Sequence, residues 1–270
     1  MNGGEDAPAP AARTWHYGLV ARWWALFNVD GPEIDFFRRY VAAAPPALDL
    51  ACGTGRLLVP YVRDGLDVDG TDVSVDMIEL CREAAAAVGA APVLAAQANH
   101  ELDLPRRYRT ILCCGGFGLG ATRAQDREGL ARVLAHLQPG GTFVVDNEVS
   151  DVDPARWRRW RLPAGPVEVP GPDERRRAPD GDDYALVHRW CSIDPDQRRG
   201  EREIHAWRWR DGALVAHEVH DLVCNVYGTD ELAGLLADVG FDGVRVCGGY
   251  DGAPLGPEHR FAVFEARAPS

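Results

Sequence analysis

The sequence predicts an α/β fold with a doubly wound, mostly parallel sheet, an N-terminal helical lid and an inserted antiparallel β-sheet. Three observations support this prediction. Between residues 47 and 147, short apolar runs alternate with segments of helical periodicity, as in a parallel sheet covered by helices. Two amphipathic segments precede the first apolar run. The alternation stops at residue 151, and three β-rich runs follow before a last helix and two strands.

Length and charge limit the possible functions. The 270 residues suffice for one domain with an elaboration. All 29 basic residues are arginines, which excludes a Schiff-base lysine mechanism. The net charge of −12 argues against a nucleic-acid partner, because phosphates are repelled without a concentrated basic patch. The arginine clusters at 156–161 and 175–177 are short and mixed, which favours solvated surface.

The cysteines and the N-terminus indicate a cytoplasmic protein. We expect buried free thiols in a reducing compartment, because the number of cysteines is odd and none has zinc-site spacing. No apolar run approaches the length of a membrane span, and residues 1–10 lack a signal-peptide pattern, so we expect no membrane association. Residues 1–12 are expected to form a disordered tail. The cysteines are Cys52, Cys81, Cys113, Cys114, Cys191, Cys224 and Cys247.

Two helices are expected before the first strand. Residues 13–27 carry apolar side chains at helical spacing, and a second amphipathic segment covers 31–43. In one interpretation these helices simply pack on the core. In the other, the first helix is a lid, because a helix in this position can reach over the carboxyl end of the first strand. Both interpretations can hold for different residues, and Tyr17 and Trp24 are the candidate lid contacts.

A glycine turn follows the first predicted strand, which covers residues 47–50. Gly53 and Gly55 permit a tight turn whose backbone can approach a ligand, and a helix begins near residue 56. The free N–H groups of that helix point into the same crevice, which indicates a nucleotide-like ligand. The loop lacks the Lys-Ser/Thr of a P-loop. Leu58 stands where a dinucleotide fingerprint has its third glycine.

The second predicted strand, residues 66–70, leads to Asp72. This carboxylate lies about twenty residues beyond the glycine turn, a spacing that places it to accept ribose hydroxyls. The alternative is that Asp72 caps the helix predicted over 74–88. Val73 and Met77 would supply apolar contacts beside an adenine.

Residues 47–147 resemble the core of class I S-adenosylmethionine-dependent methyltransferases, and are most similar to a bacterial small-molecule branch that includes glycine and amino-sugar N-methyltransferases. The resemblance is carried by DLACGTG at 49–55, the acidic end of the second strand, CCGGFG at 113–118 and LQPGGTFVVD at 137–146. It implies a Rossmann-like fold, an enzyme, and S-adenosylmethionine as cofactor. The cofactor-binding residues that it implies are Tyr17, Asp49, Ala51, Cys52, Gly53, Gly55, Asp72, Val73, Met77, Gln97, Ala98, Asn99 and Gly115.

The sequence departs from the family pattern at two positions. Ala51 replaces a glycine that is frequent in the first motif. After the third predicted strand, residues 92–97, the family often has an aspartate that accepts the adenine amino group, but this chain has Gln97-Ala98-Asn99. Gln97, Asn99 or a backbone carbonyl could replace that contact.

The rest of the predicted core has strands over 108–114, 142–146, 241–247 and 260–266, with helices over 123–137 and 231–239. Thr229 and Asp230 are expected to cap the last helix, which ends at Gly240. We assign residues 13–150 and 228–270 to the methyltransferase core.

We assign residues 151–227 to an insert that covers the acceptor or forms a dimer contact. It is predicted to contain a helix over 154–160, a loop rich in Pro and Gly, and strands over 184–193, 202–210 and 214–227. Asp211-Gly212 is a strong hairpin signal between the last two. We expect no metal site, because His217 and His220 would face opposite sides of a strand.

Methyl transfer requires little acid–base chemistry from the protein. The cofactor supplies an electrophilic methyl group, and the protein orients the acceptor and excludes water. An amine need only arrive unprotonated, whereas a phenol or alcohol benefits from a base. Glu148 and His16 are the candidates, and neither is assigned as a catalytic residue. The candidate substrate-binding residues are Trp24, Phe117, Asn147, Glu148 and Tyr227.

The predicted function is therefore methyl transfer to a small-molecule N or O acceptor. Specialised metabolism is a candidate setting, and a homodimer is a candidate assembly. Two alternatives stay open. One is a methyltransferase-like protein that binds the cofactor without turnover, against which the intact loop and Asp72 argue. The other is a nicotinamide-dependent oxidoreductase, which Leu58 and the LQPGG turn disfavour.

Overall fold

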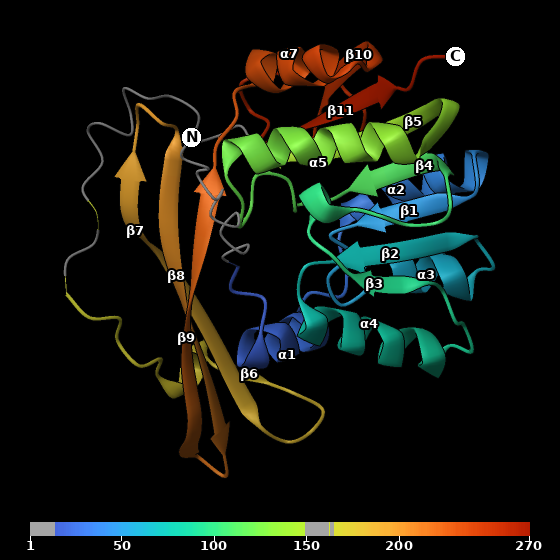
Figure 1. The fold of residues 1–270 in the computed structure, drawn as a ribbon. Coiled ribbons are helices and arrows are strands. Elements are labelled where there is room, and N and C mark those ends of the chain that lie inside the picture. The colour runs from blue at the N-terminus through green and yellow to red at the C-terminus, as the bar shows by residue number, and fades with distance from the viewer. Residues whose placement is uncertain (1–13, 149–161, 163–164) are drawn as a thin grey trace, which may run out of the picture.

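The structure is a computed structural model that describes residues 14–148, 162 and 165–270. The predicted tail and the helix predicted over 154–160 lie outside the described residues. Two sheets make up the described part (Figure 1): a central seven-stranded sheet with helices on both faces, and a four-stranded antiparallel sheet beside it. This arrangement confirms the predicted fold class.

The central sheet has the order β10-β11-β5-β4-β1-β2-β3. The strands β1 to β5 are parallel, and β11 is antiparallel to both of its neighbours. The chain moves outward from β1 to β3 and then returns to the other side of β1 with β4, so the strand order reverses between β1 and β4. Ligands of open α/β sheets bind at such a reversal, beyond the carboxyl ends of the strands. The strands are β1 (Ala47–Leu50), β2 (Val68–Asp72), β3 (Leu94–Ala96), β4 (Tyr108–Cys113), β5 (Leu137–Glu148), β10 (Asp242–Gly248) and β11 (Phe261–Arg267).

Helices cover both faces of this sheet. One face is packed by α2, α3 and α4, whose side chains join Leu112, Val144 and Val263 in a single apolar cluster. The other face is packed by α5 and α7, against Leu48 and Phe143 among others. Neighbouring residues of one strand thus serve opposite layers, as the alternation of side chains along a strand requires. The helices are α2 (Pro32–Ala43), α3 (Leu58–Arg63), α4 (Val75–Ala87), α5 (Arg123–His136) and α7 (Thr229–Val239), with a short 3-10 turn η1 (Asn99–Glu101).

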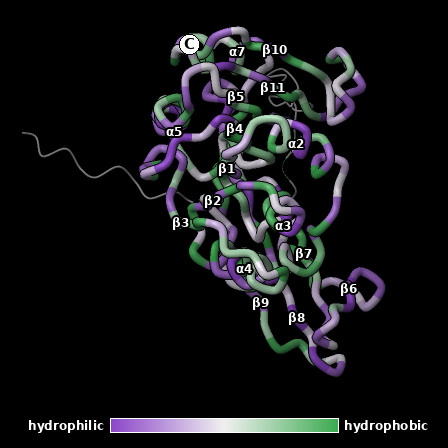
Figure 2. The backbone as a smooth tube through the Cα atoms, turned by 90° about the vertical axis from the view of Figure 1, so that its right-hand side faces the viewer, coloured by the Kyte–Doolittle hydropathy of each residue, from purple (hydrophilic) through white to green (hydrophobic). Residues whose placement is uncertain are grey.

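The second sheet, which we call sheet B, has the order β6-β7-β8-β9 and is antiparallel. The end of sheet B where β8 meets β9 extends beyond α4 in both views (Figures 1 and 2). Asp211 and Gly212, between β8 and β9, both have positive φ, so the predicted tight turn is present. A fourth strand, β6, was not predicted. The strands are β6 (Arg176–Arg177), β7 (Asp183–Asp194), β8 (Arg199–Arg210) and β9 (Ala213–Asn225).

The first helix, α1 (Gly18–Phe27), packs mainly on sheet B. Leu19 and Val20 are buried in a cluster with Trp190, Ile204 and Leu222 of that sheet. None of the helices in the described part of the chain is long and apolar enough to cross a membrane.

Two local predictions were wrong. The N-cap of α7 is Gly228, and its N–H donates to the Glu231 carboxylate at 3.2 Å, so Thr229 already lies inside the helix. The thiols are free but not all buried, because Cys191 is exposed on sheet B and Cys114 and Cys247 are partly buried.

Candidate functional site

Two cavities lie beyond the carboxyl ends of β1, β2, β4 and β5, between the central sheet on one side and α1 and sheet B on the other. The first, which we call the cofactor cavity, is lined by the glycine loop and Asp72. The second, the acceptor cavity, has a volume of about 390 Å³ and is lined by the ends of β4 and β5 and by sheet B. The two cavities are joined, because both are lined by His16, Trp24, Arg56, Cys114, Gly115 and Leu119.

The glycine loop presents open backbone to the cofactor cavity. Gly53 has a φ of +55°, and a Cβ added there would meet no atom within 4 Å. Gly55 (φ +88°) has a different role, because a Cβ there would come within 2.8 Å of the Cys81 Sγ. Gly53 is thus open to a ligand, while Gly55 allows α3 and α4 to pack closely and does not line the cavity.

Ala51, which replaces a glycine frequent in the family, keeps the left-handed conformation of a glycine, with a φ of +58°. A non-glycine residue in this region costs on the order of 1 kcal/mol. Gly116 makes room for it, because a Cβ on Gly116 would come within 2.5 Å of the Ala51 Cβ. The loop therefore retains its shape despite the substitution.

Asp72 is held by two backbone N–H groups. Its Oδ2 accepts from Gly53 at 2.9 Å and its Oδ1 accepts from Ser74 at 2.8 Å. The N-cap of α4 is Ser74, whose hydroxyl accepts from Met77, so the capping role considered for Asp72 belongs to its neighbour. Burial raises the pKa of Asp72. Burial also raises the pKa of Asp49, and the nearby charge of Asp72 raises it further.

Val73, Met77, Ala98 and Asn99, which are predicted cofactor contacts, all line the cofactor cavity. Gln97 does not line it. Its side-chain amide is paired with the backbone of Asp103, whose N–H donates to Gln97 Oε1 at 3.2 Å.

Asp126 of α5 lines the cofactor cavity and was missed by the sequence analysis. Its Oδ2 accepts from Asn225 at 2.7 Å and from the Tyr227 hydroxyl at 2.8 Å, and burial raises its pKa. An acidic residue in the first turn of a helix is ordinary, because it interacts favourably with the helix dipole, so nothing in the sequence marks Asp126 as functional. These contacts also place Tyr227, which is buried and lines neither cavity.

Residues near the N-terminus close the cofactor cavity from the side of sheet B, since Thr14, His16, Trp24 and Asn28 line it. Tyr17 does not line it. Burial raises the pKa of Tyr17, and the charges of Asp72 and Asp76 raise it further.

Both ring nitrogens of His16 are engaged. The Trp15 indole N–H can only donate, and it lies 3.1 Å from His16 Nε2. The proton of the neutral ring is therefore on Nδ1, which donates to the Thr14 hydroxyl at 2.5 Å. Burial lowers the His16 pKa to about 4. A neutral imidazole is a poor general base when both of its nitrogens form hydrogen bonds and its pKa is this low.

The acceptor cavity brings together four of the five predicted substrate-binding residues, Trp24, Phe117, Asn147 and Glu148. Glu148 accepts from Arg260 at 2.9 Å, and the Asn147 amide donates to the Tyr227 carbonyl at 2.8 Å. Asp146, beneath them, accepts from the Gly115 N–H at 2.6 Å and from the Tyr250 hydroxyl at 2.5 Å, and burial raises its pKa. The lining residues that were not predicted include Trp15, Trp190, Arg202, Leu222, Cys224, Arg260 and Phe261.

A glycine loop open to a cavity, a pinned carboxylate at the end of β2 and a strand reversal at β1 fit an adenosyl cofactor. The fold and the site resemble those of class I S-adenosylmethionine-dependent methyltransferases. Residues 47–141 match the family described as Methyltransferase domain.

A curated relative from Streptomyces fradiae, dTDP-3-amino-3,6-dideoxy-alpha-D-glucopyranose N,N-dimethyltransferase, is 31% identical over 110 residues. That match covers 40% of this chain and 42% of the length of the relative.

Two solved structures show the same fold. An S-adenosylmethionine-dependent methyltransferase from Clostridium acetobutylicum has a TM-score of 0.71 at 17% identity, covering 92% of this chain and 97% of the other. A sugar N-methyltransferase from Streptoalloteichus has a TM-score of 0.65 at 20% identity, covering 100% and 99%.

Proposed function

We propose that this protein transfers a methyl group from S-adenosylmethionine to an amine nitrogen of a small molecule. The observation that carries the proposal is the junction of the two cavities at Gly115, Trp24 and His16. A cofactor on the glycine loop and an acceptor beside sheet B would meet there. Enclosure between the sheets would exclude water and hold the reacting groups together.

The cofactor would lie along the first cavity. Asp72 would accept the ribose hydroxyls, and Val73 and Met77 would contact the adenine. Asn99 and Asp126 are the candidates for its amino group, since Gln97 is turned away. The methionine part would cross Gly53 toward the junction. When bound, this cofactor supplies the electrophilic methyl group.

The acceptor cavity favours an amine over a hydroxyl. Its walls carry the aromatic rings of Trp15, Trp24 and Phe117, and such faces attract a protonated amine as it enters. Because both nitrogens of His16 are engaged, a hydroxyl would lack a base there, whereas an unprotonated amine needs none. The N-methyltransferase names of the relatives point the same way.

We further propose a division of labour in which residues 13–150 and 228–270 bind the cofactor and residues 151–227 cover the acceptor. The free cysteines are consistent with a reducing compartment, which we propose is the cytoplasm.

The test is incubation with isotopically labelled S-adenosylmethionine and a panel of small amines, including amino sugars, beside phenols of similar size. Labelled N-methyl products, identified by mass, would support the proposal. Labelled products from the phenols alone would contradict the amine assignment. Tight cofactor binding with no product from any acceptor would favour a binding protein without turnover.

A further inference from the structure

One arginine of the acceptor cavity has a buried N–H group without a hydrogen-bond partner. Arg202 of β8 lines this cavity. Its Nε is buried and has no hydrogen-bond partner. Among residues 14–148, 162 and 165–270, Arg202 forms no ion pair within 4.0 Å. A buried donor of a charged group without a partner is costly, so a ligand that supplies the acceptor is the economical explanation.

The other charges around the cavity are already paired. Arg260 donates to Glu148 at 2.9 Å, and Arg56 forms an ion pair with Glu33 of α2. Asp146 is held by neutral donors. Carboxylates outnumber arginines in the chain by 41 to 29, so an arginine left without a carboxylate in an enclosed site is unusual for this sequence.

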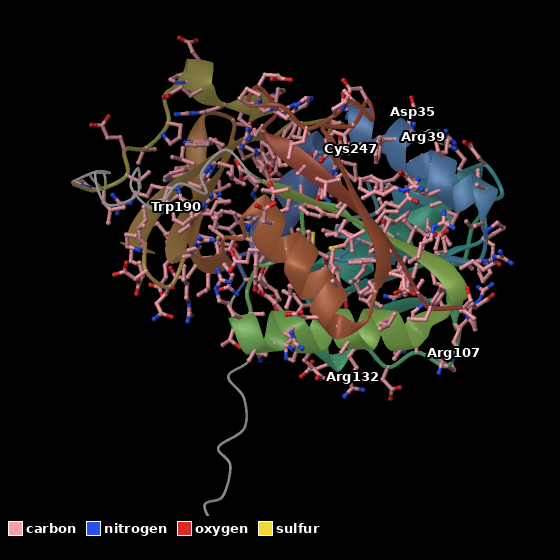
Figure 3. The ribbon with its side chains drawn as sticks, turned by 90° about the horizontal axis from the view of Figure 1, so that it is seen from above. Asp35, Arg39, Arg107, Arg132, Trp190 and Cys247 are labelled. Carbon is pink, nitrogen blue, oxygen red and sulfur yellow. The ribbon has the colours of Figure 1, made fainter. Side chains whose placement is uncertain are left out.

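The Arg202 guanidinium is positioned by Trp190 of β7, which is its cross-strand partner. The guanidinium carbon lies 3.9 Å from the centre of the indole ring. Trp190, labelled on sheet B in Figure 3, is held in turn by Gly200, because a Cβ there would come within 2.3 Å of the ring. Stacking on an indole leaves the N–H groups at the guanidinium edge, where they suit a planar or tetrahedral anion.

Arg202 and Trp190 line only the acceptor cavity and not the cofactor cavity. The reacting nitrogen belongs near the junction of the cavities, whereas this arginine lies on the wall formed by sheet B. One acceptor molecule could therefore present an amine at the junction and a different group to Arg202.

We propose that the acceptor carries an anionic group, a phosphate or a carboxylate, and that Arg202 binds this group on the sheet B wall of the acceptor cavity. The inference rests on the proposed function, because it assumes that this cavity holds the acceptor. It makes Arg202 a residue that determines substrate specificity.

The test compares three probes of similar size: glucose 1-phosphate, glucuronate and glucose. Their binding is measured by calorimetry with the protein saturated with S-adenosylhomocysteine. We expect at least one anionic probe to bind about tenfold more tightly than glucose, as for a charge-assisted contact. The anion that is preferred identifies the phosphate or the carboxylate as the group recognised. The variant R202Q should lose the preference, and R202K should retain part of it.

The control is R199Q, on the opposite face of the same strand and outside both cavities, which should bind all probes as the wild type does. Equal binding of charged and neutral probes, no detectable binding of either anion, or a preference that survives in R202Q would overturn the proposal. S-adenosylhomocysteine affinity is measured first in each protein. If the wild type does not bind S-adenosylhomocysteine, the proposed function is contradicted. If it binds S-adenosylhomocysteine but shows no preference for an anionic probe, only the role of Arg202 is contradicted.

Discussion

Gly53 and its neighbours show how single residues shape the cofactor cavity. Gly53, Gly55 and Ala51 all have positive φ, yet each for a different reason. Gly55 has no room for a side chain, Ala51 has room only because residue 116 is glycine, and Gly53 faces open space. Of the three, Gly53 is the residue at which a side chain would most directly occupy the volume of a ligand.

Gly53→Val should therefore abolish cofactor binding in a folded protein. The β-branched side chain would enter the cavity, and it would also resist a φ of +55°. We expect at least about a hundredfold loss in S-adenosylhomocysteine affinity by calorimetry. The matched control is Gly65→Val, which has a similar strain (φ +81°) and free space but lies in the turn before β2. Unchanged affinity in a folded Gly53→Val protein would refute the placement of the cofactor.

His16 should make stability depend on pH. Its pKa is lowered from 6.5 to about 4, so between these values the unfolded chain takes up a proton that the folded chain refuses. This contribution to stability is fully present above pH about 6.5 and is lost as the pH falls toward 4. Because the His16 side chain is only partly buried, we expect the free energy of unfolding to fall by about 2 kcal/mol, which is less than the whole pKa shift would give.

The measurement is urea denaturation of the wild type and of His16→Gln between pH 4.5 and 8. The quantity compared is the difference between their free energies of unfolding at each pH. The buried aspartates with raised pKa act in the opposite direction, but they are common to both proteins and cancel. The difference should be flat above pH 7.5 and should shift in favour of the variant below pH 6. A difference that does not change with pH would show that His16 is not held neutral.

At the scale of elements, the sequence predicted what depends on local pattern. The glycine turn and the hairpin at Asp211-Gly212 are each encoded within a few residues, and the parallel core follows from the alternation of short apolar runs with helical segments. Contacts between distant segments were not predictable in this way. Nothing near Arg202 in the sequence shows that its cross-strand neighbour is Trp190, and nothing near Asp126 shows its contact with Asn225 of β9. Gln97 was a reasonable candidate by position, but a local bond to Asp103 turns it away.

The start of α1 is another such long-range feature. Its N-cap, Tyr17, makes no side-chain capping bond. The first N–H groups donate instead to carboxylates of other elements: Gly18 to Asp76 of α4 at 2.7 Å, and Leu19 to Glu218 of β9 at 2.8 Å. These bonds fix the segment that carries His16 and Trp24 over the cofactor cavity. Truncation could not test whether α1 is a lid, because Leu19 and Val20 are buried in the apolar cluster that α1 forms with sheet B.

Glu218→Ala should loosen α1 without removing it. Losing one capping carboxylate costs about 1 kcal/mol, so amide hydrogen exchange over residues 18–27 should accelerate several-fold. Cofactor affinity should fall as well, because Trp24 lines the cavity. Glu79→Ala, an exposed position of α4, is the control and should exchange like the wild type. Unaltered exchange in Glu218→Ala would show that packing alone holds the helix.

At the scale of the whole molecule, the two sheets have separate tasks under our proposal. The glycine loop and Asp72 belong to the central sheet, whereas Trp190, Arg202 and Leu222 of sheet B line only the acceptor cavity. The contacts of Asn225 and Tyr227 with Asp126 are a direct link between the end of β9 and the cofactor cavity. Side chains on the opposite face of sheet B, among them Val187, Val215 and Val219, are exposed and could meet a second copy of the chain.

This division predicts that substitutions on the acceptor-cavity wall or on the exposed face of sheet B change acceptor selectivity or self-association but leave cofactor binding nearly intact, unlike Glu218→Ala, which acts through α1. Trp190→Phe and Leu222→Met should alter the ratio of kcat/KM values across an amine panel, because both side chains line the acceptor cavity. Val215→Thr and Val219→Thr should weaken any dimer observed by sedimentation, because they remove exposed apolar surface from one face. In all four proteins S-adenosylhomocysteine affinity should stay within about threefold, or roughly 0.7 kcal/mol. None of these four side chains lines the cofactor cavity that contains Asp72 and Gly53. Loss of cofactor binding in several of the folded variants would therefore contradict the division and show that sheet B belongs to the cofactor site.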